Sequence, residues 1–244
     1  MFRRIWMCAL ACLPLAASAR EIAPGTETEA LELITQARQD RTDGYFNRSE
    51  REYKRAMSII EQVWGPQSPE LTPVLNGLAE LYFDAGRYSE AAVLARRSAK
   101  VVETTLGAAH PLMATALHDL AAIYLVQGQT AEAEPLYRRA LKIREAALGP
   151  DHPFVATTLC GLADLELGQG HLDSASAYFA RALKIQQRAF GENDPRVART
   201  LASYAVVLCK TGHHKEGVAA QAKSHAILTH VPASSRGPDV AIAR

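Results

Sequence analysis

Apolar residues recur along this chain at spacings of three and four residues, in stretches that glycine and proline interrupt. In one stretch Leu117, Leu120 and Tyr124 fall on a single face of an α-helix, because about 3.6 residues complete a helical turn. Gly128 follows, and glycine is the residue that most often ends a helix. A second stretch of the same kind then continues to Leu148. The pattern predicts two helices joined by a tight turn.

These helix pairs repeat with a period of 42 residues. Four loops with the letters GPQSP, GAAHP, GPDHP and GENDP begin at Gly65, Gly107, Gly149 and Gly191. A second glycine follows 21 residues after each of them, at Gly86, Gly128, Gly170 and Gly212. The proline that ends each loop suits the first turn of a helix, where a missing N–H costs no hydrogen bond. The repeats therefore run at about 65–106, 107–148, 149–190 and 191–232, after a divergent copy at 23–64 that keeps Gly44.

The residues before the loop prolines are expected at helix starts. Asp151 and Asp194 can each cap a helix N-terminus by accepting a backbone N–H. His110 and His152 directly precede a proline, which favours a structural position over a chemical one. We therefore predict that these loops connect the repeats and form no site of their own.

The repeats resemble a known family. The stretch LHDLAAIY at 117–124 and the pairs Ala133–Tyr137 and Ala175–Phe179 resemble the tetratricopeptide repeat. The period is 42 residues, against about 34 in that family, and the unchanged spacings place the extra residues late in the second helix. This longer form is similar to the kinesin-light-chain type. The resemblance covers nearly all of the chain after its first residues.

Repeats of this kind predict an all-α protein. A single helix pair cannot bury its apolar face alone, whereas stacked pairs share one continuous core. About five pairs exceed the three or so that stability needs. We expect a right-handed α-solenoid.

The N-terminus differs from the repeats. Arg3 and Arg4 precede an uncharged run from Ile5 to Ala17, and an Ala-Ser-Ala sequence ends at Ala19. This order is typical of a secretory signal peptide. The run of 13 residues is shorter than the about 20 apolar residues of a membrane span.

We expect cleavage after Ala19, which gives a signal peptide at 1–19, a repeat array at 20–231 and a flexible tail at 232–244. The expected location is the periplasm, after secretion across the inner membrane. The alternative is a lipid anchor on Cys12, in the sequence ALAC.

Composition excludes little beyond this. The chain has 244 residues, of which 48% are hydrophobic, and its formal net charge is +1. Nothing in this charge balance favours nucleic acid or a membrane surface as a partner.

The resemblance implies that the first helix of each pair lines a concave groove, with positions 8, 11, 15 and 18 residues after the loop glycine facing it. The residues at these positions that we predict to contact a partner are Asn76, Glu80, Phe83, Thr115, His118, Leu125, Thr157, Cys160, Asp164, Leu167 and Arg199.

Two readings of this groove remain open. In light-chain-type repeats the 11-residue position is often asparagine, whose amide can pair with a peptide backbone, and Asn76 alone keeps it here. Phe83, Leu125 and Leu167 form an apolar stripe that can hold a helix or an extended peptide. The alternative is that these three side chains pack against neighbouring helices and form no site.

Other candidate chemistry is weak. Cys160 and Cys209 lie in adjacent repeats but seven residues apart in register, or about 10 Å, whereas a disulfide needs Cα atoms within about 7 Å. We predict two free thiols. His213 and His214 fall in a turn, where exposure is the default, and no spacing predicts a metal site or a cofactor.

Arg97, Arg139 and Arg181 belong to a basic column on the second helices, which a solvated convex face explains. No catalytic motif occurs, so we do not expect an enzyme.

The sequence therefore predicts a scaffold or adaptor that binds a protein or peptide in its concave groove. The alternative is a self-assembling structural protein of the cell envelope, because Val218, Ile227 and Leu228 could leave an apolar end face.

Overall fold

The structure, a computed structural model, describes residues 26–230, and the predicted signal peptide and C-terminal tail lie outside them. All regular structure in this range is helical, which confirms the all-α prediction. The helices are α1 (Thr26–Thr42), α2 (Phe46–Trp64), η1 (Pro69–Leu71), α3 (Thr72–Asp84), α4 (Tyr88–Thr105), α5 (Pro111–Val126), α6 (Thr130–Leu148), α7 (Pro153–Gly168), α8 (Leu172–Phe190), α9 (Pro195–Lys210) and α10 (His214–His230).

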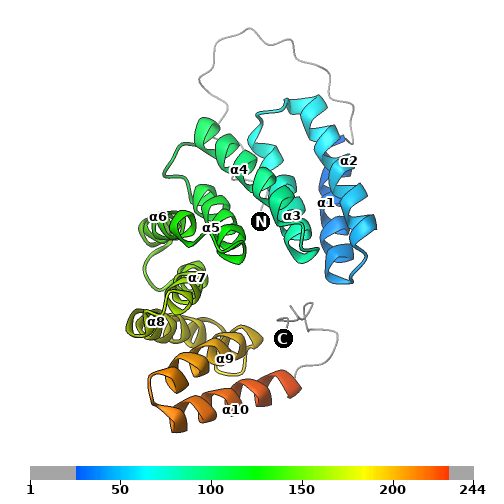
Figure 1. The fold of residues 1–244 in the computed structure, drawn as a ribbon. Helices are drawn as coiled ribbons and strands as arrows, with labels where there is room; N and C mark the ends of the chain where they lie inside the picture. Colours follow the sequence, from blue (N-terminus) through cyan, green and yellow to red (C-terminus); the bar gives the residue numbers. More distant parts are fainter. Residues whose placement is uncertain (1–25, 231–244) are drawn as a thin grey trace.

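The helices form five antiparallel hairpins that stack into an arc (Figure 1). Consecutive odd-numbered helices contact each other, whereas within residues 26–230 no even-numbered helix contacts another even-numbered helix. The odd-numbered helices therefore line the inside of the arc and the even-numbered helices its outside. This arrangement is a solenoid of the tetratricopeptide type, and its inner side is built from first helices, as expected.

The turns within the helix pairs contain glycine residues, because the backbone at these positions has a left-handed conformation with positive φ. Gly44 has φ 82° and Gly128 has φ 76°, so the divergent first hairpin turns in the same way as the third. At such φ values any side chain is strained, which explains why both positions are glycine.

Side-chain caps begin the inner helices. Asp194 accepts the N–H of Arg196 at 2.8 Å, as predicted. In the preceding loop His152 Nδ1 accepts the N–H of Phe154 at 3.2 Å, whereas Asp151 is exposed and lies 3.7 Å from Arg188. The prediction that Asp151 caps a helix was wrong, because the residue directly before the proline holds the N-cap position. His110 caps α5 in the same way.

Aromatic residues on the outer helices fill the core between repeats. Tyr53, Tyr137 and Phe179 are at most 2% exposed. Alanines such as Ala133 and Ala140 are fully buried, so the backbones of neighbouring helices come close. Both kinds of residue recur with the repeat, and the core is therefore continuous along the array.

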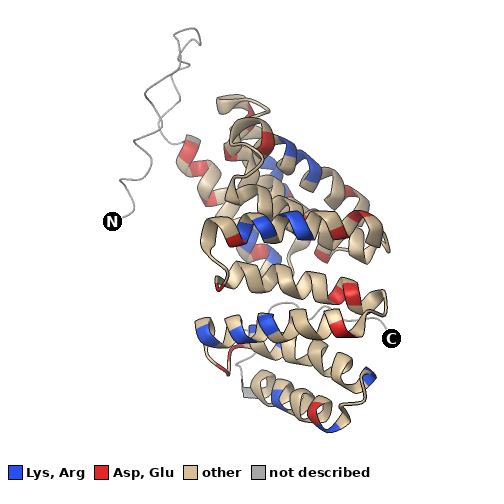
Figure 2. Ribbon diagram, turned by 90° about the vertical axis from the view of Figure 1, so that its left-hand side faces the viewer, with Lys and Arg blue, Asp and Glu red and all other residues tan. Residues whose placement is uncertain are grey.

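The basic column on the outer side connects successive repeats. Arg181 pairs with Glu145 at 2.7 Å and donates to the carbonyl of Pro150 at 3.1 Å. Arg139 makes the equivalent contacts with Glu103 and Ala108, and Arg97 pairs with Glu61. Figure 2 views this outer side, where Lys and Arg recur on successive helices. These arginines therefore link each repeat to the one before it, which goes beyond the solvated face that the sequence predicted.

Candidate functional site

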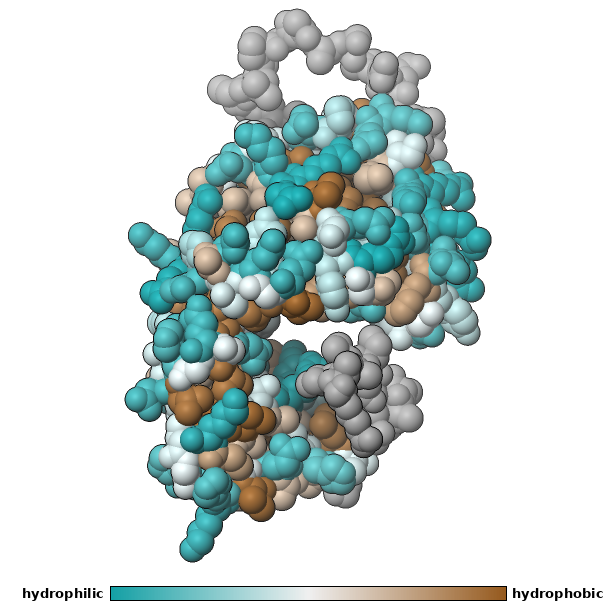
Figure 3. Space-filling view, in the orientation of Figure 1, coloured by the Kyte–Doolittle hydropathy of each residue, from teal (hydrophilic) through white to brown (hydrophobic). Residues whose placement is uncertain are grey.

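The inner surface of the arc carries two hollows, and Figure 3 shows the molecule hollowed on this side. The first, of about 680 Å³, lies among α1, α3 and α5. The second, of about 380 Å³, lies between α7 and α9. The groove residues predicted from the sequence are divided between these hollows, the helix surface between them and the core.

Asn76 and Glu80 line the first hollow, together with Thr72. Asn76 Oδ1 and Thr72 Oγ1 are buried and have no hydrogen-bond partner among residues 26–230. Leu106 and Leu112 add apolar surface at its edge, each 39% exposed. An unpaired buried acceptor costs free energy until a donor reaches it, so this hollow can bind a ligand that carries N–H groups.

The charges beside this hollow are largely paired. Arg41 lies between Glu80 at 2.8 Å and Asp84 at 2.6 Å. Partial burial raises the pKa of Glu80. Arg38 also lines the hollow, and its charge, like that of Arg41, favours the ionised form of Glu80. The hollow thus lies beside a cluster of largely balanced charges.

The middle of the inner surface is occupied by His118 and Asp119 of α5. The ring of His118 packs edge-on against Tyr137, with centroids 5.3 Å apart. Burial, with Arg144 nearby, lowers the pKa of His118 to about 3, so the imidazole is neutral. Burial raises the pKa of Asp119 to about 7. His118 is half-buried, and its Nδ1 is buried without a hydrogen-bond partner among residues 26–230.

Thr157, Cys160, Asp164 and Arg199 all line the second hollow. Cys160 Sγ lies 3.5 Å from Thr200 Oγ1, and burial raises the pKa of the Cys160 thiol to about 11. This cysteine is therefore a neutral thiol and a poor nucleophile. Burial also raises the pKa of Asp164 to about 6. Cys160 and Cys209 are both free, which confirms the prediction of two thiols.

The predicted apolar stripe does not stand free. Phe83, Leu125 and Leu167 are half-buried and pack against the core between repeats. Phe83 meets Tyr88 edge-on at 5.4 Å. These contacts agree with the packed alternative for these three residues. Thr115 is half-buried on α5 and lines neither hollow.

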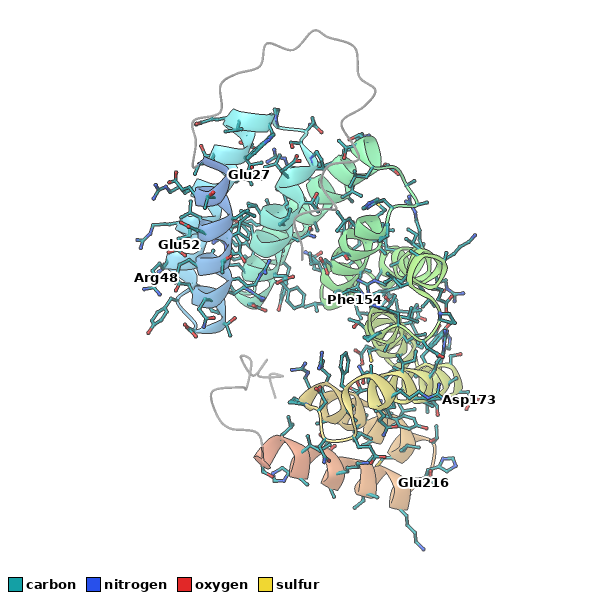
Figure 4. The ribbon with its side chains drawn as sticks, turned by 180° about the vertical axis from the view of Figure 1, so that it is seen from behind. Glu27, Arg48, Glu52, Phe154, Asp173 and Glu216 are labelled. Atoms are coloured by element: carbon teal, nitrogen blue, oxygen red, sulfur yellow. The ribbon has the colours of Figure 1, made fainter. Side chains whose placement is uncertain are left out.

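Sequence reasoning missed the apolar residues that are exposed on the inner side. Phe154 is 56% exposed at the start of α7 and lines the second hollow (Figure 4). Leu112 has the equivalent place at the start of α5. Both lie five residues after a loop glycine, a column that reads Glu70, Leu112, Phe154 and Arg196. That column could have been found by extending the repeat alignment into the first helical turn.

The end of the array is less apolar than expected. Ile227 is 6% exposed and Leu228 is half-buried, because both pack against α9, and only Val218 is exposed, at 67%. Gln221 and His225 stand where the preceding repeat has Phe179 and Leu183. Polar residues at these positions are typical of a terminal repeat that faces solvent.

Comparison with known families agrees with this structure. Residues 112–187 and 74–112 each match a model of the tetratricopeptide repeat. No curated protein matches the chain significantly. These matches identify tetratricopeptide repeats over residues 74–187, and domains built from this repeat typically bind proteins and are generally non-catalytic.

Several solved structures share the fold. BtubC (BKLC) from P. vanneervenii has a TM-score of 0.67 at 22% identity, covering 90% of this chain and 98% of that one. A putative kinesin light chain from Podosopora anserina has a TM-score of 0.66 at 20% identity, covering 85% and 98%. A Rap protein complexed with Competence and Sporulation Factor has a TM-score of 0.69 at 17% identity, covering 83% of this chain and 55% of that one.

The chain is thus structurally similar to kinesin-light-chain-like repeat proteins. Within the described residues, none of the helices is long and apolar enough to cross a membrane. In the same range, no three His, Cys, Asp or Glu side chains converge as a metal site. The candidate functional site is therefore the inner surface with its two hollows.

Proposed function

We propose that this protein is an exported adaptor that binds an extended segment of a partner protein along its inner surface and performs no chemistry. The observation that carries the proposal is the first hollow, where Asn76 Oδ1 and Thr72 Oγ1 are buried beside exposed Leu112 and have no hydrogen-bond partner in the described part of the chain. A peptide backbone in this hollow supplies the missing N–H groups, and its side chains cover the leucines.

One of the comparisons supports binding of a separate partner. The Rap structure, which shares the fold, is a complex with Competence and Sporulation Factor. The inner helices here expose their first turns, so a segment that crosses them meets Leu112 and then Phe154.

A selection experiment tests the binding. Twelve-residue peptides displayed on phage are selected against residues 20–244, and the winners are measured by calorimetry. We expect Asn76→Ala to weaken binding about tenfold, the effect of one lost hydrogen bond to a buried group. Leu112→Asp weakens it further. Asn193→Ala, in an exposed loop, is the matched control and leaves affinity unchanged. Peptides that bind equally well to the Asn76 and Leu112 variants would refute the proposal.

Export is tested separately. In a bacterial host the full chain is expected in the periplasmic fraction, and N-terminal sequencing of the mature protein is expected to begin at Arg20. Palmitate labelling that depends on Cys12 would favour the lipid-anchored form instead. A chain that keeps Met1 in the cytoplasm would exclude both routes.

A further inference from the structure

The last helix of the described array, α10, has one face without a neighbour. It contacts α9 and no other helix of residues 26–230, at the open end of the arc (Figure 1). A third hollow, of about 630 Å³, lies along this face and is lined by Val218, Gln221, Ala222, His225, Ala226 and Thr229. None of these six side chains carries a formal charge at pH 7 with histidine neutral. The face is thus an uncharged surface on a chain in which 22% of the residues are charged.

On α8 the equivalent face is covered by the first helix of the next repeat. Leu183 is 7% exposed and packs in one cluster with Val197 and Ala198, from the first turns of α9. His225 stands 42 residues after Leu183, at the same place on α10, and is exposed. The third hollow is therefore the place where a further first helix would pack.

The chain after α10 contains residues of the kind with which such a helix begins. In the three preceding repeats, the pairs that start two residues after the loop proline are at most 3% exposed, and they are Met113-Ala114, Val155-Ala156 and Val197-Ala198. The stretch PDVAIAR at 238–244 has the same pattern, with Val240 and Ala241 after Pro238. Pro238 comes 43 residues after Pro195, one more than the period. The sequence thus starts another repeat after a loop that is one residue longer.

The connection allows this segment to reach the face of α10. Residues 231–237 lie between α10 and Pro238, whereas only residues 191–194 connect α8 to α9. Seven residues can span up to about 23 Å when extended, so the longer connection can make the same turn. Because α9 begins beside the end of α8, a helix that begins at Pro238 meets the C-terminal half of α10, where His225 and Thr229 lie. Gln221, in the N-terminal half, stays in contact with water.

We propose that residues 238–244 form the first two turns of a sixth first helix and dock on the C-terminal half of α10. In this arrangement Val240 packs over His225, as Val197 packs against Leu183. The third hollow is then an interaction surface whose occupant is a segment of the same chain. The inference goes beyond the proposed function and does not depend on it, because this surface lies outside the two inner hollows.

The local sequence agrees with this arrangement. Pro238 suits the first position of a helix, and the carboxylate of Asp239 in the first turn is favoured by the helix dipole. Ile242 takes the column of Arg199, which is exposed on α9, so its side chain points away from α10. A helix of seven residues is unstable alone in water, so its formation requires docking. The docked segment also occupies the face that a second copy of the chain would need for end-to-end pairing.

Hydrogen exchange measured by NMR on residues 20–244 tests the docking. In the docked helix the amides of Ile242, Ala243 and Arg244 donate to carbonyls four residues earlier. We expect them to exchange about tenfold more slowly in the parent than in the Val240→Asp variant. Ile242→Asp is the matched control, because it places the same charge on the exposed side of the segment, and it should keep the slow exchange. In the parent, NOE spectra should connect the Val240 methyl protons to the ring protons of His225.

Substitutions on α10 test the surface itself. His225→Lys places a charge beneath Val240 and should remove the slow exchange of the amides at 242–244. Ala219→Lys, on an exposed residue of α10 that does not line the hollow, should leave it unchanged. Both positions are exposed, so the spectra of α1 to α9 should be the same in the parent and in the two variants. Sedimentation of the parent is expected to show a monomer.

Three results would overturn the inference. The first is exchange at 242–244 that is as fast in the parent as in Val240→Asp. The second is an equal loss of slow exchange in Val240→Asp and Ile242→Asp, which would show a non-specific apolar contact. The third is a dimer of the parent that Val218→Asp dissociates and Val240→Asp leaves intact, which would assign the face to a second copy of the chain. None of these measurements involves Asn76 or Leu112, so failure here leaves the proposed function untouched.

Discussion

The ring of Tyr137 occupies the space that any side chain at Gly161 would need. A Cβ added at Gly161 would lie 2.5 Å from Tyr137 Cε1 and 2.6 Å from its Cζ. Tyr53 has the same relation to Gly77, two repeats earlier in the chain. Each glycine thus lets an outer helix place a tyrosine ring directly against the next inner helix.

Gly161→Ala is therefore expected to destabilise the array by about 1–3 kcal/mol, because the buried ring has no room to move. Gly168→Ala is the matched control on the same helix. A Cβ there meets nothing within 4 Å, so this variant should be neutral or slightly stabilising. Urea midpoints followed by circular dichroism give both values. Equal midpoints for the two variants would contradict the packing argument.

Asp119 should make stability depend on pH. Burial raises the pKa of its carboxyl from 3.8 to about 7, so the native state holds this proton more tightly than the unfolded chain. Stability therefore falls as pH rises from about 4 to about 7, by on the order of 3 kcal/mol, and no further above that range.

Asp119→Asn removes this titration. We expect the variant to be clearly more stable than the parent at pH 8 and similar to it at pH 4.5, as measured by urea midpoints at both values. Asp173→Asn, on an exposed residue of α8, is the control and keeps the pH dependence of the parent. A variant with the same pH dependence as the parent would show that Asp119 ionises freely.

The histidine N-cap of α7 should contribute a measurable free energy to the stability of the fold. His152→Ala removes the acceptor for the N–H of Phe154 and should cost about 1 kcal/mol. His152→Asp restores an acceptor of the kind that Asp194 provides for α9, and should recover or exceed the parent stability. The melting temperatures of the parent and the two variants test this prediction. An Asp variant that melts as low as the Ala variant would exclude capping.

The ion pairs that the outer arginines form should contribute little to the stability of the array, and their contribution should fall as the salt concentration rises. The side chains of Arg181 and Glu145 are 39% and 33% exposed, so solvent screens the pair. A double-mutant cycle with Arg181→Met and Glu145→Gln is expected to give a coupling below about 1 kcal/mol that shrinks in 1 M salt. The same cycle on Arg188 and Asp151, 3.7 Å apart and more exposed, serves as the control and should give no coupling. A larger coupling there than at Arg181 would contradict the structural role of the column.

Much of the fold follows from local rules. Left-handed glycines, loop prolines and helical spacings act within a few residues, so the repeat alignment placed Gly44, Gly128 and the second helices before any contact was known. The free cysteines followed from the register of the repeats. The site was less predictable, because the column positions name which helix face a residue occupies and not how deeply its neighbours cover it.

The sequence by itself thus determined a stack of five helix pairs and their turns, whereas the resemblance to the repeat family implied that first helices line the inner side of the arc. Only the tertiary structure decided which side chains on that inner side remain available. Phe83 and Leu167 are half-buried because they pack against core clusters shared with neighbouring helices, whereas Phe154 is exposed in the first turn of α7. Gln186 reaches the groove from an outer helix, since its long side chain passes between α7 and α9. Such contacts depend on the distances between helices far apart in sequence, which no spacing within one repeat encodes.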